Sequence, residues 1–208
     1  MFLRFHAWLT ARPGSSLASV RQRFVALDLE TTGLDPRRDA VVSLAAIPFV
    51  NGAPNGGYVT LVDPGRPIPA DSTAIHGVTD DMVRGAPRLD RLLRDAEAVL
   101  GDDVLVGHNV GFDVAVLTRA RRTLGLSRLN NAALDTRRLV AGLHPEWREL
   151  TLEHVAGRLG LELVARHTAE GDALTAGRIF LALLPELEAH RLGTVRELLW
   201  FQRQVPLL

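Results

Sequence analysis

Two acidic residues stand inside an otherwise apolar segment. The segment FVALDLE (24–30) has the composition of a buried β-strand, and it contains Asp28 and Glu30. Because side chains alternate across a strand, both carboxylates project from the same face. Two like charges side by side in a core strand are unfavourable unless a cation neutralises them. The pair therefore indicates either a metal site or an exposed strand end with ion pairs to Arg37 or Arg38.

Another acidic position follows a second predicted strand. The segment DVLVG (103–107) predicts a short buried strand, and Asp113 falls in the first turn of the helix expected from about 112 to 124. An Asp in a first turn often only interacts with the helix dipole. Here, however, His108 and Asn109 place polar groups at the end of a strand, where open sheets form ligand crevices. Both a structural and a ligating role stay open for Asp113.

A third group lies in the segment RHTAEGDALTAGRIF (166–180), which contains His167 and Asp172. Small residues recur at helical spacing after Asp172, so this helix can lie close against the sheet. That packing would bring Asp172 near the strand that carries Asp28, with His167 on the loop before the helix. Taken alone, a histidine in this position is more often a solvated loop residue than a functional one. The small-residue face consists of Ala173, Ala176, Gly177 and Phe180.

The predicted strands and helices must bring these acidic residues and His167 together. Runs of β-branched and aliphatic residues predict strands, and apolar residues at helical spacing predict helices. Turn residues join the first three strands into an antiparallel meander, and later strands alternate with helices. The expected fold class is α/β, with a mixed five-stranded sheet flanked by helices. The expected strands are 24–30, 41–50, 58–62, 103–107 and 133–135, and the expected helices are 87–100, 112–124, 136–142, 151–159, 170–184 and 193–203.

The composition limits the chemistry further. Among 208 residues, 24 basic and 24 acidic residues cancel and every basic residue is Arg, which excludes nucleic-acid binding through a bulk excess of positive charge. The chain has no cysteine, so any metal must be held by oxygen or imidazole, and a thiolate zinc site or cysteine nucleophile is excluded. No segment has the apolar length of an export signal or a membrane span. We therefore expect a cytoplasmic protein with no membrane partner.

Together the three motifs resemble those of the DEDDh-type 3′ to 5′ exonucleases, the superfamily that includes the proofreading epsilon subunit of bacterial DNA polymerase III. DLETTGLDP (28–36) resembles the first family motif, HNVGFD (108–113) the second, and His167 with Asp172 the third. The third motif departs from the family in one respect, because Ala165-Arg166 stands in place of the usual tyrosine-bearing lead-in.

The resemblance implies a ribonuclease H-like fold and hydrolysis of terminal phosphodiester bonds with two divalent cations, Mg²⁺ or Mn²⁺. By that resemblance, Asp28, Glu30, Asp113 and Asp172 hold the metals, and Asp28 bridges both. His167 would be the general base that takes a proton from the attacking water, a task that suits an imidazole. Carboxylates without thiols are also the ligands that these hard cations prefer.

The resemblance further implies contacts with the 3′-terminal nucleotide. Members of the family use the segment just after the first acidic pair, where Gly33 would allow close backbone approach and Leu34 would wedge against a base. Exposed aromatic or imidazole rings can stack on an unpaired base of any identity, although Phe112 is equally consistent with core packing. The candidate substrate-binding residues are Thr31, Thr32, Gly33, Leu34, His76, Asn109 and Phe112.

We expect an N-terminal extension (1–23), an exonuclease domain (24–185) and a C-terminal helical extension (186–208). The expected partner is single-stranded or frayed nucleic acid with a free 3′ end, DNA in preference to RNA. Any association with a DNA polymerase is expected to be loose. Three alternatives stay open: a catalytically inactive nucleic-acid-binding or scaffold protein with a nuclease fold, an RNA-trimming exonuclease, and a metal-dependent phosphohydrolase of small nucleotides.

Overall fold

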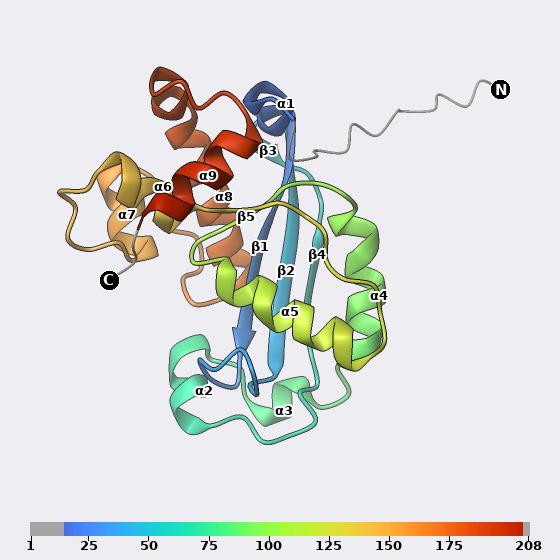
Figure 1. Ribbon diagram of the computed structural model, residues 1–208. Helices are drawn as coiled ribbons and strands as arrows, with labels where there is room; N and C mark the ends of the chain where they lie inside the picture. The colour runs from blue at the N-terminus through green and yellow to red at the C-terminus, as the bar shows by residue number, and fades with distance from the viewer. Residues whose placement is uncertain (1–14, 206–208) are drawn as a thin grey trace.

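One mixed sheet of six strands organises the chain, as seen in the computed structural model, which describes residues 15–205 (Figure 1). The strands are β1 (Arg23–Thr31), β2 (Val41–Val50), β3 (Ala53–Pro54), β4 (Tyr58–Leu61), β5 (Leu105–Gly107) and β6 (Ala133–Asp135). β2 is antiparallel to β1, β3 and β4, whereas β1, β5 and β6 run parallel. The predicted meander is confirmed, and the additional strand is the two-residue β3, which is too short to give a pattern of alternation.

The helices are α1 (Leu17–Gln22), α2 (Ala70–His76), α3 (Asp80–Val83), α4 (Leu89–Leu100), α5 (Gly111–Thr123), α6 (Thr136–Leu143), α7 (Leu152–Arg158), α8 (Ala169–Ala189) and α9 (Val195–Gln204). The six helices predicted from residue 87 onward are confirmed. α2 and α3 were not predicted, because helices this short show no apolar periodicity. α1 lies within the expected N-terminal extension (1–23), of which residues 1–14 lie outside the described residues.

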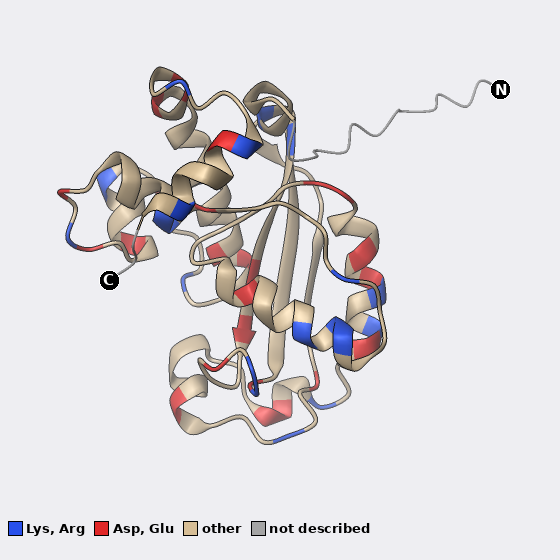
Figure 2. Cartoon of the chain, in the orientation of Figure 1, with Lys and Arg blue, Asp and Glu red and all other residues tan. Residues whose placement is uncertain are grey.

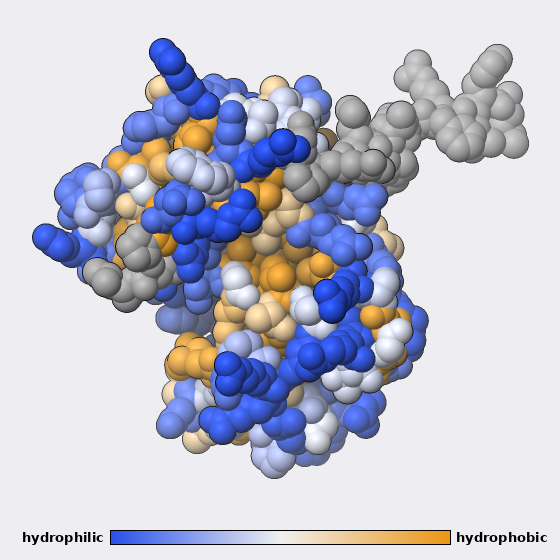
Figure 3. Space-filling view, viewed as in Figure 1, coloured by the Kyte–Doolittle hydropathy of each residue, from blue (hydrophilic) through white to orange (hydrophobic). Residues whose placement is uncertain are grey.

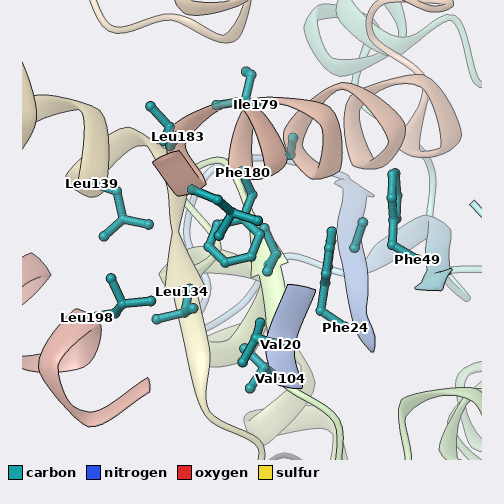
Figure 4. Packing of buried hydrophobic residues seen from close by; sticks show 14 of the residues in the cluster. Val20, Phe24, Phe49, Val104, Leu134, Leu139, Ile179, Phe180, Leu183 and Leu198 are labelled. Carbon is teal, nitrogen blue, oxygen red and sulfur yellow. The ribbon is translucent and has the colours of Figure 1, made fainter. Parts of the chain in front are cut away.

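The two faces of the sheet pack on different helices. Along β1, Phe24 faces α8, while Val25 and Leu27 face α4 and α5. On the α8 face, Phe24 stacks on Phe49 with ring centroids 4.9 Å apart and meets Phe180 edge to face at 5.2 Å (Figure 4). Because side chains alternate, Asp28 and every second residue before it face α8.

The predicted small-residue face of α8 is confirmed. At Gly177 a Cβ would lie 2.5 Å from the Phe49 ring, so only glycine allows this approach of α8 to β2. Ala173 and Ala176 are buried on the same face. The close approach sets the first turn of α8, which carries Asp172, against the end of β1.

Elements at both ends of the described chain share the α8-side core. Leu17 of α1 and Leu198 of α9 are buried in that cluster. α8 continues through Pro185 to Ala189, so the boundary expected between residues 185 and 186 falls inside a continuous helix. Within residues 15–205, no helix combines the length and apolar composition needed to cross a membrane.

Candidate active site

The end of β1 carries two acidic residues, and α8 brings a third to them. One carboxylate oxygen from each of Asp28, Glu30 and Asp172 lies within 4.8 Å of the others. Figure 2 shows acidic segments of β1, α5 and α8 near one another. The alternative in which Asp28 and Glu30 pair with Arg37 or Arg38 is wrong, because Arg38 pairs with Asp35 and Arg37 forms no ion pair within residues 15–205.

Asp113 is held beside this cluster by a backbone hydrogen bond. β5 pairs only with the first half of β1. The backbone N–H groups in the second half of β1, on the side that faces β5, therefore need other partners. The Leu29 N–H donates to Asp113 Oδ1 at 3.0 Å. Asp113 is buried in the first turn of α5, as predicted. Its carboxyl group therefore completes the sheet edge and is the fourth acid of the site, next to Asp28.

The crowded carboxylates raise the pKa of one another. Burial, followed by the charges of Asp113, Asp172 and Glu30, holds the pKa of Asp28 well above its usual value. Burial and the charge of Asp172 raise the pKa of Glu30 to about 7. Burial also raises the pKa of Asp113 and of Asp172. Because each acid resists ionisation next to the others, the site favours the binding of positive charge.

One arginine already supplies positive charge to the cluster. The Arg166 guanidinium donates through Nη1 to Asp172 Oδ2 and through Nε to Glu153 Oε1, the latter at 2.6 Å. Its charge lowers the pKa of Asp28 and Glu30 against the larger effect of burial. The residue that departs from the family pattern before His167 is thus in direct contact with a candidate metal ligand.

The residues present fit divalent cations. Asp172 Oδ1 is buried and has no hydrogen-bond partner among the described residues, although buried carboxylate oxygens are normally satisfied. Converging carboxylates without thiols suit Mg²⁺ or Mn²⁺ better than a structural zinc. Asp28, Glu30 and Asp172 are therefore able to hold a hard cation, with Asp113 adjacent.

His167 lies on the tight turn that leads into α8. Its φ is 62° and that of Ala165 is 35°, so residues in the left-handed region stand on both sides of Arg166. Such strain costs on the order of 1–3 kcal/mol per residue and clusters at functional sites. Gly171 makes room for the turn, because a Cβ there would lie 2.0 Å from a carbonyl oxygen of the turn. Burial raises the pKa of Asp172, whereas the charge of Arg166, a backbone hydrogen bond from His167 and the charge of His167 lower it, so His167 lies next to Asp172.

A pocket of about 340 Å³, here called the Leu34 pocket, opens on one side of Asp28. The loop after β1 forms one wall, and Asp39 closes this loop by accepting the Asp35 N–H at 2.8 Å. A Cβ on Gly33 would lie 2.5 Å from Asp39 Oδ2, so the loop packs tightly. Leu34 projects from it with 86% of its surface exposed. An exposed apolar side chain at this place can contact a base.

Six of the seven predicted substrate-binding residues line the Leu34 pocket: Thr31, Gly33, Leu34, His76, Asn109 and Phe112. The Thr32 hydroxyl instead accepts the Ala40 N–H at 3.0 Å within the loop. His76 is buried, and its Nδ1 accepts the Val78 N–H. Burial lowers the pKa of His76, so the neutral ring carries its proton on Nε2. A hydrogen bond to the Thr31 backbone opposes this shift of the pKa, so the His76 ring also contacts the end of β1.

A second pocket of about 470 Å³, here called the Arg148 pocket, also has Asp28 in its lining. It shares Asp28, His108 and Asn109 with the Leu34 pocket. Figure 3 shows a notch at the left of the molecule, between the part that carries α6 and α7 and the part that carries α2. The basic side chains that line the Arg148 pocket are Arg137, Arg148 and Arg166.

A family model described as Exonuclease matches residues 25–180, a range that holds the four acids and His167. The chain belongs to this exonuclease family. It is 43% identical over 176 residues to the DNA polymerase III subunit epsilon-like protein of Rhodobacter capsulatus. That alignment covers 82% of this chain and 25% of the relative, so the chain spans about a quarter of its length.

Solved exonucleases share the fold of this family member. E. coli Exonuclease I in complex with a dT13 oligonucleotide superposes with a TM-score of 0.69 and 20% identity, over 81% of this chain and 43% of that one. Exonuclease X in complex with 5′ overhanging duplex DNA gives 0.63 and 22%, over 86% and 98%. The predicted ribonuclease H-like architecture is therefore confirmed, with six strands in place of five.

The exonuclease motifs identified the acids, but not the residues that pair with their charges or that close the loop beside them. Arg166, Glu153 and Asp39 were missed. The spacing of Asp35 and Asp39 in DPRRD is a turn signal from which the closed loop could have been predicted. For Arg166 and Glu153 the signal is absent, because they lie 13 positions apart and meet only through the packing of α7 and α8.

Proposed function

We propose that this exonuclease-family protein hydrolyses the 3′-terminal phosphodiester bond of single-stranded or frayed nucleic acid and releases nucleoside 5′-monophosphates. The observation that carries the proposal is the convergence of Asp28, Glu30 and Asp172 beside Asp113, where the Leu34 pocket and the Arg148 pocket meet at Asp28. DNA is the favoured substrate, which is supported by the DNA polymerase III name of the relative and the oligonucleotide complex of Exonuclease I.

In this proposal Asp28, Glu30, Asp113 and Asp172 hold two divalent cations, Mg²⁺ or Mn²⁺. When bound, such cations stabilise negative charge on the attacking and the leaving oxygen. An imidazole nitrogen of His167 takes a proton from the attacking water. The water oxygen bonds to the terminal phosphorus as the bond from phosphorus to the 3′ oxygen of the preceding nucleotide breaks. The leaving 3′ oxygen takes a proton from solvent water, so the shortened strand ends in a 3′ hydroxyl.

The proposal also covers partners and location. Nucleic acid with a free 3′ end is the main partner, and any association with a DNA polymerase is loose. The protein would act in the cytoplasm, where bacterial nucleic acid is found. An inactive scaffold has less support, since the four acids converge and His167 stands beside them.

The test measures mononucleotide release from 3′-labelled single-stranded DNA and RNA, with Mn²⁺ or with a chelator. We expect release by the wild type with Mn²⁺, none with the chelator, and a loss of at least about 10³-fold in Asp28→Asn, because the metal contributes several kcal/mol to transition-state stabilisation. Asp81→Asn is the matched control, since Asp81 is exposed on α3 and pairs with Arg84.

Three results would contradict parts of the proposal. If the wild type releases no mononucleotide with any divalent metal, the proposed activity is wrong. If Asp28→Asn is as active as the wild type, the site assignment is wrong. Faster release from RNA than from DNA would favour an RNA-trimming enzyme over one that acts on DNA.

A further inference from the structure

We propose that the Arg148 pocket binds the phosphates of the strand upstream of the scissile bond, and that Arg137 and Arg148 are the residues that bind them. This assignment rests on the proposed function and deepens it. The two pockets beside Asp28 would then bind different parts of one nucleic-acid strand. The terminal nucleoside would lie in the Leu34 pocket, and the upstream strand would lie in the Arg148 pocket.

The chemistry of a strand end distinguishes the two pockets. The terminal nucleotide carries only the scissile phosphate, which lies at the carboxylate cluster, so its own pocket must accept a base and a sugar. The continuing strand carries a further phosphate at every nucleotide. The lining of the Leu34 pocket contains apolar side chains and acids but no arginine among the described residues. The lining of the Arg148 pocket contains three arginines beside the cluster acids Asp28 and Asp172 and beside Glu149, which pairs with His154. Phosphates therefore fit the second pocket.

Two of these three arginines have no protein partner in the described part of the chain and can therefore bind a phosphate. Arg166 is engaged with Asp172 and Glu153. Within residues 15–205, the side chains of Arg137 and Arg148 form no hydrogen bond or ion pair. Arg137 is half-buried and Arg148 is exposed. A guanidinium without a protein partner at the edge of an acidic site is suited to an anionic ligand, because its planar donors match the phosphate oxygens.

The walls of the Arg148 pocket are tied to the active site. His108 follows β5 directly, and its Nδ1 lies 2.9 Å from Thr136 Oγ1 at the start of α6. Its Nε2 lies 2.8 Å from the Leu150 carbonyl oxygen at the end of the loop between α6 and α7. Arg137 follows Thr136, and Arg148 lies two residues before Leu150. One half-buried imidazole thus fixes both arginine-bearing segments relative to the strand end next to Asp28.

A different basic groove supplies the matched control. A groove of about 770 Å³ lies between α5 and the loop after it, and its lining includes Arg119, Arg122 and Arg128. It shares no lining residue with the two pockets beside Asp28. Arg122 is exposed there, as Arg148 is in its own pocket. If the strand followed α5, Arg122 would bind its phosphates.

The experiment compares two substrates in the full chain with Mn²⁺. One is a 3′-labelled oligothymidylate, and the other is the 4-nitrophenyl ester of thymidine 5′-monophosphate, which has a terminal nucleotide but no upstream strand. In Arg137→Gln/Arg148→Gln we expect kcat/KM on the oligonucleotide to fall about 10-fold, mainly through KM, because the variant cannot form charged hydrogen bonds to phosphate. Hydrolysis of the ester should change less than about twofold, because the ester has no upstream phosphate to bind.

The salt dependence gives a second measure. The slope of log kcat/KM against log salt on the oligonucleotide should become shallower by about 0.7 for each phosphate that an arginine no longer neutralises. Arg122→Gln should match the wild type on both substrates. An equal fall in rate on oligonucleotide and ester in the double variant, an unchanged oligonucleotide rate, or a larger fall in Arg122→Gln would overturn the assignment. If the wild type hydrolyses neither substrate, the proposed function itself fails.

Discussion

Glu30 shows how the acidic cluster affects stability at the scale of one residue. Its pKa is about 7 in the folded protein against 4.5 for an ordinary glutamate. The folded state therefore binds more protons than the unfolded state between these values, and the free energy of unfolding falls as pH rises from about 4.5 to 7. We expect the metal-free protein to lose about 2 kcal/mol over this window, with solvent screening of this half-buried group included. Urea unfolding in a chelator at several pH values measures the slope.

Glu30→Gln is the control for this pH dependence, because it removes the titrating group. The variant should show a flatter profile between pH 4.5 and 7. Saturating Mn²⁺ should oppose the wild-type trend, since metal binds the ionised carboxylates and its affinity rises with pH. A metal-free wild type that becomes more stable over the same window would contradict the electrostatic description of the cluster.

Arg166 is predicted to compete with metal for Asp172. In Arg166→Gln, the acids Asp172 and Glu153 lose their cation, so the free energy of unfolding without metal should drop by about 2 kcal/mol. Mn²⁺ should raise the Tm of this variant more than that of the wild type, because no guanidinium has to leave Asp172. Thermal unfolding with and without Mn²⁺ measures both effects.

The exposed pair Arg84–Asp81 provides the comparison for Arg166. Both side chains are largely in solvent, so Arg84→Gln should shift the unfolding free energy by less than about 1 kcal/mol and leave the Mn²⁺ response unchanged. A Mn²⁺-induced Tm shift in Arg166→Gln that is smaller than in the wild type would mean that the guanidinium supports metal binding.

At the scale of elements, the site depends on how α8 meets the turn before it. A Cβ on Gly171 would lie 2.0 Å and 2.3 Å from the carbonyl oxygens of Val164 and Ala165. Gly171→Ala must therefore displace the turn that carries Arg166 and His167. We expect a loss of about 2 kcal/mol in unfolding free energy, together with a fall in exonuclease rate of at least about 10-fold. Urea unfolding and mononucleotide release measure the two effects.

Gly157→Ala in α7 is the matched control, because a Cβ there meets nothing within 4 Å. Alanine in a helix is favoured over glycine, so this variant should be more stable by about 0.5 kcal/mol and equally active. If Gly171→Ala behaves like Gly157→Ala, the close packing of the turn on α8 is not what positions His167.

At the scale of the whole molecule, equal numbers of acids and arginines leave no bulk attraction for nucleic acid. Binding must come from the metal-loaded cluster and from local arginines. We expect a single strand with a cleavage-resistant 3′ phosphorothioate to bind at least about 10-fold more weakly in a chelator than with Mg²⁺. Fluorescence anisotropy measures the change, and a covalently closed duplex, which has no free end, serves as the control. Tight binding of that duplex in a chelator would contradict the prediction.

The sequence by itself determined most elements and the acids they carry. The strand around Asp28 and Glu30 follows from local composition, and their shared face follows from the period of two of a β-strand. The close packing of α8 follows from small residues such as Gly177 at helical spacing. These features depend on neighbours along the chain, so a single sequence is sufficient to predict them.

Only the tertiary structure decided which groups pair with the acids of the site and which loops form the walls of its pockets. Asp113 is fixed by the N–H of Leu29 because β5 is short, and Arg166 contacts Asp172 from a turn in which both of its neighbours have positive φ. The separation of the Leu34 and Arg148 pockets likewise comes from loops distant in sequence. Contacts of this kind join segments whose local patterns carry no information about one another, because burial and charge pairing act through space.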